Sequence, residues 1–279
     1  MLLTAYNGES EAMAYALARG IRKWNRDLAI AVLGLNYVCG LNWGRLAVVR
    51  TVRAVGAHRT EEKWFNKLGA LSQTPFEETL YLDSDMVVMC DLHEWMNYLR
   101  TDDLTFFNVL LDAATIPDQT IVNVVNPHRM RERYALTATA VIDAGGHFLF
   151  RNTPRGRRLL ERIVEVMQEA LEKGPESLYA RLAGPGNIAA SDEIAASIVA
   201  VEEDIALPPA IIGTQRPIGI YMTPAQSDGR FDFEKGAAQY HDTWRGGCVT
   251  ASAVHFCSHG KYNPDYRAWV HKQVEDGHR

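Results

Sequence analysis

Several features that define a protein class at first sight are scarce or missing in this sequence. Its 279 residues contain only four cysteines, spread along the chain, as expected for free thiols in a reducing cytoplasm rather than for a disulfide framework. No apolar run approaches the roughly 20 residues needed to span a bilayer. The N-terminus also lacks the basic flank and cleavage site of a signal peptide. We therefore expect a cytoplasmic protein without a membrane span.

Positive charge is not in excess either. The chain has 29 Lys and Arg residues against 34 Asp and Glu residues, a net charge of −5, and a pI near 6.0. No basic field therefore favours binding to nucleic acid or to an anionic membrane. Repeats, low-complexity tracts and Ser/Gly linkers are absent from the sequence, and the 47% hydrophobic content is ordinary for a globular protein. These properties predict one composite domain over residues 1–279.

The first part of the chain alternates between strand-like and helix-like patterns. Short apolar runs typical of buried strands cover residues 1–6, 28–33, 46–52 and 80–82. Apolar residues at helical spacing predict helices over residues 9–24 and 63–71. Repeated strand–helix units predict an α/β fold with a mostly parallel central sheet and helices on both faces. In such folds ligands bind at the carboxyl ends of the strands.

The second part of the chain is less regular. Its clearest helix covers residues 153–173, with Thr153 as the N-cap, Pro154 in the first turn and Gly174 after the end. The remaining expectations are strands over 106–112 and 146–150, a helix over 191–201, and Gly- and Pro-rich loops with short strands over 207–244.

Two acidic residues, Asp83 and Asp85, follow the apolar run at residues 80–82. Alternate strand residues point the same way, so both carboxylates lie on one side of the backbone, roughly 6–7 Å apart at Cα. Two like charges this close are unfavourable without a cation. Hard cations such as Mg²⁺ and Mn²⁺ bind carboxylate and phosphate oxygens. The segment therefore favours a divalent metal site; the alternative is a strand end whose acids cap the next loop.

The segment Asp83-Ser84-Asp85 resembles the DxD motif of metal-dependent, nucleotide-sugar glycosyltransferases of the GT-A fold. Further segments resemble family GT8, the glycogenin and bacterial galactosyltransferase group, and occur in the family's order. They lie at residues 65–68, 143–148 and 191–193. The resemblance covers most of the chain as short motifs.

A C-terminal pair, His255 and Lys261, keeps the six-residue spacing of the C-terminal motif of that family. Ser258, Tyr262 and Asn263 stand where the family has Gly, Pro and Trp. The resemblance assigns His255 as the third metal ligand and Lys261 to the diphosphate of the donor. His259 competes for the same ligand position.

The resemblance implies a hexosyltransferase of class EC 2.4 that moves a hexose-type sugar from a UDP-sugar with retention of configuration. Its cofactor is Mn²⁺ or Mg²⁺, and its metal ligands are Asp83, Asp85 and His255. The residues expected to bind the donor are Thr4, Ala5, Tyr6, Asn7, Lys67, Asp83, Ser84, Asp85, Gly145, Gly146 and Lys261. A metal bridging both phosphates, a Lys and backbone N–H groups would stabilise the charge that develops on the leaving diphosphate.

Asp192 and Glu193 are the candidate catalytic residues, and Glu193 stands where the family has Gln. A carboxylate can stabilise an oxocarbenium-like centre or act as a nucleophile. The residues alone also fit a second interpretation, in which Ser191 caps a helix and both acids favour its dipole. Similarly, Tyr6 either stacks on the uracil of the donor or packs on the sheet.

The resemblance divides the domain into a nucleotide-binding half at 1–90, an acceptor half at 91–247 and a metal and diphosphate segment at 248–265. The acceptor stays open among a sugar, a lipid, a protein and a modified nucleobase, because acceptor-binding loops vary.

Two other functions stay open. A run ending in Asp-x-Asp also fits the first motif of haloacid-dehalogenase-like phosphatases, with Asp83 as nucleophile, Asp85 as acid/base and Mg²⁺ between them. That family usually begins its sheet with this strand, whereas several strand–helix units precede it here. The other alternative is a non-catalytic nucleotide-sugar-binding protein with the same fold.

Overall fold

The computed structural model of this protein divides into two compact units. Unit 1 comprises Met1–Arg53, Leu82–Trp95 and Gly213–Arg279, and unit 2 comprises Ala54–Tyr81 and Met96–Ile212. The structure describes residues 1–44, 46–52, 62–106, 108–111, 126–135, 139–142, 147–182, 192–208, 220–222, 230–242, 247–256 and 261–277.

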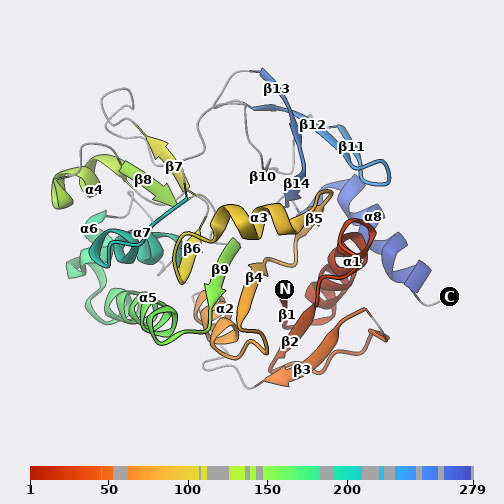
Figure 1. The fold of residues 1–279 in the computed structure, drawn as a ribbon, viewed down its shortest axis with the longest axis horizontal. Helices are drawn as coiled ribbons and strands as arrows, with labels where there is room; N and C mark the ends of the chain where they lie inside the picture. The colour runs from red at the N-terminus through yellow and green to blue at the C-terminus, as the bar shows by residue number, and fades with distance from the viewer. Residues whose placement is uncertain are drawn as a thin grey trace. The chain divides into compact units, whose positions relative to one another are not determined.

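Unit 1 contains three parallel strands in the order β3-β2-β1 (Figure 1). They are β1 (Leu2–Ala5), β2 (Ala31–Leu35) and β3 (Val48–Val52). Leu2 pairs with Ala31, which in turn pairs with Val48. The parallel pairing requires crossover connections, and α1 (Gly8–Trp24) supplies the first of these. Asn7 caps α1, because its side chain accepts a hydrogen bond from the Ser10 amide at 2.8 Å.

A second group of strands in unit 1 joins distant parts of the sequence. β5 (Met86–Val88) pairs antiparallel with β14 (Ala253–His255), and β14 pairs parallel with β10 (Ile220–Met222). The strands β11 (Arg230–Asp232), β12 (Ala237–Asp242) and β13 (Gly247–Ala251) form an antiparallel sheet. Helix α8 (Pro264–Gly277) follows and lies beside α1 (Figure 1).

A largely hydrophobic cluster anchors β5 and β14 in unit 1. Its buried members come from α1, β5, β14, α8 and the β11–β13 sheet: Met13, Ala16, Val87, Met89, Phe233, Ala238, Ala251, Val254, Phe256, Tyr266 and Trp269. Burying a large apolar side chain contributes about 1.5–3 kcal/mol, so this cluster holds the two strands firmly in register.

Unit 2 contains β4 (Glu78–Leu82, whose last residue belongs to unit 1), β9 (His147–Arg151) and β6 (Leu104–Phe106), in the order β4-β9-β6. β6 and β9 are antiparallel. A separate pair is formed by β7 (Asn108–Leu111) and β8 (Thr139–Ile142). The helices are α2 (Glu62–Ser72), α4 (Pro127–Tyr134), α5 (Pro154–Lys173), α6 (Leu178–Leu182), α7 (Asp192–Glu202) and the 3₁₀ helix η1 (Gly174–Glu176). α3 (Leu92–Leu99) contains residues of both units.

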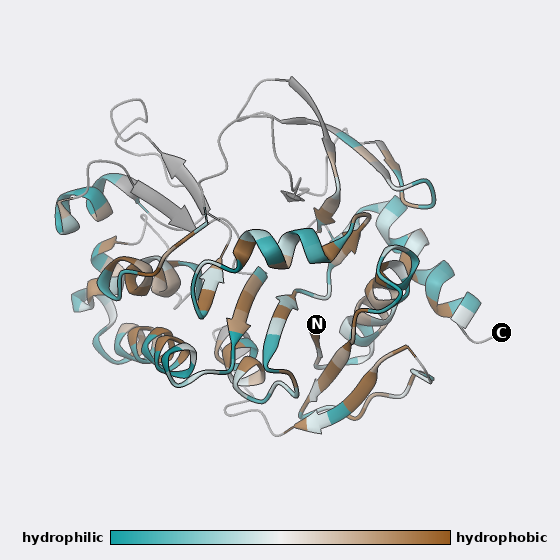
Figure 2. Cartoon of the chain, in the orientation of Figure 1, coloured by the Kyte–Doolittle hydropathy of each residue, from teal (hydrophilic) through white to brown (hydrophobic). Residues whose placement is uncertain are grey.

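The fold class predicted from the sequence, an α/β fold with a mostly parallel central sheet and helices, is confirmed. The helix predicted over 153–173 is confirmed with its cap, since the Thr153 hydroxyl accepts a hydrogen bond from the Gly156 amide at 3.0 Å. Figure 2 shows hydrophobic and hydrophilic residues alternating around α5, as amphipathic spacing requires. The division at residues 90 and 247 stays a prediction.

Two strand predictions were partly wrong. The apolar run 28–33 was predicted as a strand, but β2 begins at Ala31. The carbonyl of Leu28 accepts a hydrogen bond from the Arg22 guanidinium, and that of Ala29 from the terminal ammonium group, so neither carbonyl is free for a strand partner. The strand predicted over 106–112 is divided between β6 and β7, because β6 pairs with β9 whereas β7 pairs with β8.

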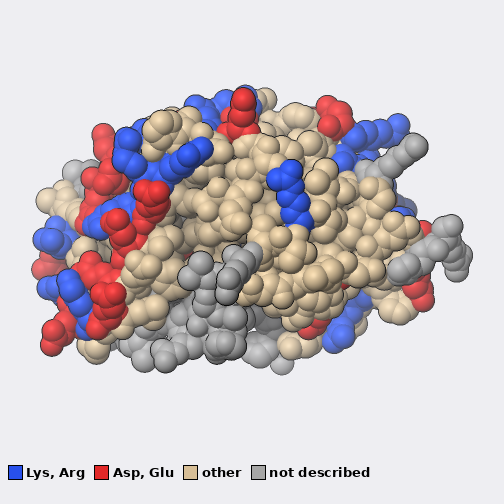
Figure 3. Space-filling model, turned by 90° about the horizontal axis from the view of Figure 1, so that it is seen from below, with Lys and Arg blue, Asp and Glu red and all other residues tan. Residues whose placement is uncertain are grey.

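Among the described residues, no helix is both long enough and apolar enough to cross a membrane. On the face shown in Figure 3, Lys and Arg side chains lie among Asp and Glu side chains without forming a continuous basic surface. This distribution agrees with the absence of a basic field in the composition.

Candidate active site

The pairing of β5 with β14 brings together residues that are 170 positions apart in the sequence. His255 pairs with Met86, the residue after Asp85. The next amide, that of Phe256, donates a hydrogen bond to the Asp85 carbonyl oxygen at 2.8 Å. The register of two short strands therefore positions the imidazole beside the two aspartates.

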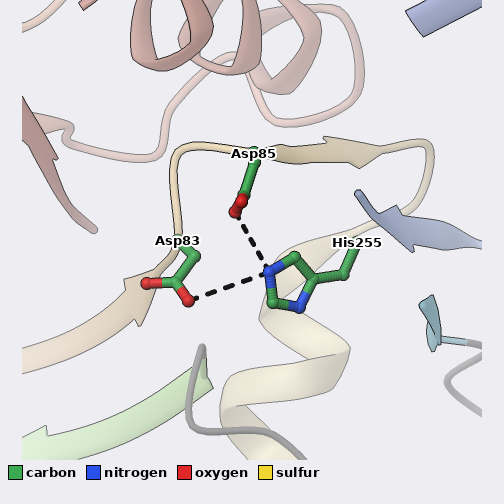
Figure 4. A group of neighbouring side chains, drawn as sticks. All are labelled: Asp83, Asp85 and His255. Carbon is green, nitrogen blue, oxygen red and sulfur yellow. Dashed lines mark hydrogen bonds and ion pairs between the residues drawn. The ribbon is translucent and has the colours of Figure 1, made fainter. Parts of the chain in front are cut away.

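In the resulting cluster the imidazole of His255 points toward both carboxylates (Figure 4). Its Nε2 lies 3.0 Å from Asp85 Oδ1 and 3.8 Å from Asp83 Oδ2. Asp85 and His255 are buried, whereas the side chain of Asp83 is 24% exposed. Lys261 Nζ lies 3.4 Å from Asp85 Oδ2. Unit 1 thus brings together four residues that the sequence analysis selected.

The electrostatics of the cluster keep its charged groups charged. Burial raises the pKa of Asp85, but the charge and hydrogen bond of His255 and the charge of Lys261 outweigh burial and lower this pKa to about 2. Burial lowers the pKa of Lys261, yet the neighbouring Asp85, together with Tyr6, raises it above its usual value. At neutral pH the site therefore presents a carboxylate and an ammonium group.

These residues fit a divalent cation. One ligand atom each from Asp83, Asp85 and His255 lies within 4.8 Å of the others. Two ligand atoms that bind one ion at about 2.1 Å each are at most about 4.2 Å apart. The three side chains would therefore need to move only slightly toward one another to bind the same ion. Two carboxylate oxygens and an imidazole nitrogen suit Mn²⁺ and also Mg²⁺, which takes oxygen ligands more readily.

The predicted donor residues at the end of β1 differ in their environments. Thr4 and Ala5 are buried, whereas Tyr6 is 43% exposed. Burial raises the pKa of the Tyr6 phenol, Lys261 lowers it and Asp85 raises it, so the phenol lies within electrostatic reach of the cluster. The side chain of Asn7 caps α1.

A second buried pair lies in unit 2. Lys67 on α2 and Asp192, the first residue of α7, form an ion pair of 2.8 Å, and their side chains are 9% and 2% exposed. Lys67 Nζ also lies 5.6 Å from the ring centroid of Tyr81 and 5.5 Å from that of Phe148. Both rings present a favourable face to the cation. Glu193, next to Asp192, is half-buried.

Some residues that support these two sites were not indicated by the motifs in the sequence. Tyr81 and Phe148 stand in the expected strands, but their strand neighbours are buried as well, so no local pattern indicates that these two rings face Lys67. Asn263 caps α8 by accepting hydrogen bonds from the amides of Asp265 and Tyr266 at 3.0 and 3.2 Å. Asn followed by Pro is a typical helix start, so this signal was readable in the sequence.

The remaining residues predicted for the site differ in whether the structure describes them. Gly145, Gly146, Ser191 and the rival ligand His259 lie outside the described residues. Ser84 is buried between the two aspartates.

Comparisons with solved structures identify the fold. The galactosyltransferase LgtC, in complex with donor and acceptor sugar analogues, aligns with a TM-score of 0.54 and 12% identity over 99% of this chain and 94% of LgtC. An active-site Gln-to-Glu mutant of LgtC aligns with the same score. The bifunctional glycosyltransferase WbbM, in its apo form, aligns with a TM-score of 0.56 and 11% identity over 98% of this chain but 49% of WbbM. No protein-family model and no curated protein sequence matches the chain.

The chain therefore has the GT-A fold of nucleotide-sugar glycosyltransferases and resembles family GT8. At 11–12% identity this likeness concerns the fold. A fold of this kind does not determine an activity, which depends on the residues of the site.

Proposed function

We propose that this protein is a glycosyltransferase of class EC 2.4 that moves a hexose-type sugar from a UDP-sugar, with a divalent cation held by Asp83, Asp85 and His255. The observation that carries the proposal is the convergence of these three ligands with Lys261 in unit 1. The GT-A fold supports it, because neighbours such as LgtC are named as glycosyltransferases.

The candidate site residues of unit 1 would bind the leaving nucleoside diphosphate. Bound between the ligands, Mn²⁺ or Mg²⁺ would neutralise charge on the diphosphate. Lys261, now paired with Asp85 at 3.4 Å, would donate hydrogen bonds to a phosphate oxygen and hold its positive charge where negative charge develops. Tyr6, exposed beside the cluster, offers its ring to the uracil.

In unit 2, Asp192 fixes the Lys67 ammonium group, and the pair suits the binding of donor hydroxyls. Asp192 and Glu193 are the candidates beside the reacting sugar, where a carboxylate either stabilises an oxocarbenium-like centre or attacks it as a nucleophile. The Gln-to-Glu active-site mutant of LgtC makes the Glu193 carboxylate of special interest, since this residue stands where family GT8 has Gln. Retention of configuration is part of the proposal.

The test is a panel of nucleotide sugars, each assayed for release of nucleoside diphosphate with and without Mn²⁺. We expect release from a UDP-sugar that requires the metal and falls at least about 100-fold in Asp85→Asn. Asp91→Asn is the matched control, since Asp91 is an exposed acid that caps α3 and Asn keeps this cap.

Failure of every donor to release diphosphate in a metal-dependent way would refute the transferase. Binding of a nucleotide sugar without turnover would instead support the non-catalytic alternative. Hydrolysis of phosphate monoesters that depends on Asp83 would favour the phosphatase.

A further inference from the structure

A cavity of about 570 Å³ lies in unit 2, where α4 and α6 meet. Pockets of this size commonly hold small molecules. The described residues that line it are Arg129, Glu132, Arg133, Leu178, Arg181 and Leu182. Three arginines and one glutamate give this lining a charge of +2, in a chain whose net charge is −5.

Hydrogen bonds between the two helices bring these arginines together. The Asn126 amide donates to the Leu182 carbonyl oxygen at 3.0 Å, and Arg129 Nη1 donates to the Arg181 carbonyl oxygen at 3.2 Å. Arg181 in turn donates from Nη2 to the Glu176 carbonyl at 3.1 Å and is thereby oriented. Arg133 stands four residues after Arg129, so the two cations share one face of α4.

Arg133 and Arg181 differ from several other described arginines of the chain in having no carboxylate at ion-pair distance. Arg155 pairs with Asp102 at 3.0 Å, and Arg162 with Glu202 at 3.1 Å. Within the described part of the chain, neither Arg133 nor Arg181 forms an ion pair with a carboxylate, and Glu132 forms none with them. A guanidinium group without a carboxylate beside it attracts anions from solution, which favours an external anion next to Arg133 and Arg181.

We propose that this cavity binds a soluble phosphate monoester. Guanidinium groups hold phosphate oxygens through paired, charge-assisted hydrogen bonds. Leu178 and Leu182 add an apolar wall against which the carbon skeleton of the ligand packs. The lining is concave, which suits a small molecule better than a flat anionic membrane. The proposal is independent of the transferase activity, because none of these residues belongs to the proposed donor site.

The test measures binding of inorganic phosphate and of glucose 6-phosphate by titration calorimetry at fixed ionic strength. We expect both to bind and glucose not to bind. Arg133→Gln should weaken the binding about tenfold, as loss of a charge-assisted hydrogen bond predicts. Arg158→Gln, which removes an exposed charge on α5, is the matched control and should leave affinity unchanged. Lys261→Ala should also retain binding, which separates this cavity from the proposed donor site.

Arg133 donates no described hydrogen bond to the backbone, so its replacement tests the cavity without disturbing the helix pair. Unchanged phosphate affinity in both Arg133→Gln and Arg181→Gln would overturn the proposal. Flotation with vesicles of phosphatidylcholine, with and without phosphatidic acid, separates the sources: binding to the acidic vesicles without any binding of soluble phosphate would also overturn it. Donor turnover in Arg133→Gln should equal that of the wild type, so the two proposals fail separately.

Discussion

Unit 1 and unit 2 each hold a buried group of charged residues, but the two groups balance their charges differently. In unit 2 the pair of Lys67 and Asp192 is one cation and one anion at 2.8 Å, nearly closed to solvent and bordered by two aromatic rings. In unit 1 the carboxylates of Asp83 and Asp85 and the imidazole of His255 converge beside Lys261. Their three ligand atoms lie within 4.8 Å of one another, an arrangement that suits a cation.

This difference separates a group in which a cation and an anion already face each other from one whose ligand atoms are arranged for a metal ion. A buried pair that loses one partner leaves an uncompensated charge, whose burial is expensive. A cluster of convergent metal ligands instead gains a cation from solution. Breaking the Lys67–Asp192 pair should therefore lower stability in addition to any effect on the donor, whereas changes at the metal ligands of unit 1 should act mainly on binding.

The largest effect is expected from Lys67→Met, which leaves Asp192 buried without its cation. Breaking a buried ion pair costs about 3–5 kcal/mol of unfolding free energy. Urea denaturation of the variant, followed by circular dichroism, measures this loss.

The double variant Lys67→Met with Asp192→Leu is the control, because it replaces both charges by apolar groups. Replacing a whole buried pair is often neutral. We expect the double variant to recover most of the stability that the single variant loses. A loss of unfolding free energy below 1 kcal/mol in the single variant would show that Asp192 does not depend on Lys67 for its charge balance.

The second effect is on metal binding in unit 1. His255→Ala removes a neutral ligand and should lower the affinity for Mn²⁺ by about 100-fold, which corresponds to about 2.7 kcal/mol. Donor affinity should fall with it. Titration of Mn²⁺, monitored by calorimetry, gives the constant.

His271→Ala is the matched control for this substitution, since His271 lies on α8 in the same unit and its side chain is 74% exposed. Its Mn²⁺ affinity should equal that of the wild type. Unchanged metal affinity in His255→Ala would exclude this residue from the site and leave His259 as the rival ligand.

The third effect concerns a more exposed ion pair of unit 2, whose contribution to the unfolding free energy can be compared with that of the buried Lys67–Asp192 pair. Asp102 pairs with Arg155 at 3.0 Å, but the Arg155 side chain is 40% exposed. Burial raises the pKa of Asp102, but hydrogen bonds from Arg155 and the amides of Ala206 and Asp103 outweigh burial and lower this pKa to about 2. After discounting for solvent screening, Asp102→Asn should cost about 1–2 kcal/mol at pH 7.

The pH dependence of this cost has a definite sign. Because the folded pKa of Asp102 lies below the unfolded value of about 3.9, its contribution is complete above pH 5 and disappears as the pH falls toward 2. Unfolding free energies of wild type and variant, measured between pH 7 and pH 2, should therefore converge. A difference that stays constant over this range would contradict the assignment.

Much of the fold could be predicted from the sequence, because its strongest signals are local. Helix 153–173 has an amphipathic period with a cap at each end, and β1 is a short, fully buried and mainly apolar run. The boundary of β2 could not be predicted, since it depends on hydrogen bonds from Arg22 and from the N-terminal ammonium group. Both hydrogen bonds come from groups outside the apolar run, so the hydropathy of the run does not indicate them.

The candidate sites were predictable for a different reason. Asp83, Asp85, His255 and Lys261 were selected through motif spacing in a resemblance, and the pairing of β5 with β14 brings them together. The pairing of Lys67 with Asp192 was not predicted, although both residues were selected, because two helices far apart in the sequence supply them. The sequence indicated the residues, and the fold determined their partners.

The smallest effect is expected from Tyr266→Phe, which tests how much of unit 1 serves packing alone. Tyr266 stacks on Phe256, the residue after His255, with ring centroids 4.3 Å apart. Its buried hydroxyl has no hydrogen-bond partner within the described part of the chain. Removing an unsatisfied hydroxyl while keeping the ring should raise the unfolding free energy slightly, by less than about 1 kcal/mol, and leave Mn²⁺ affinity unchanged. Tyr266→Leu, which also removes the stack, should be destabilising. A fall in metal affinity in Tyr266→Phe would instead show that the hydroxyl acts on the metal site, where Asp85 is its nearest proposed ligand in electrostatic terms.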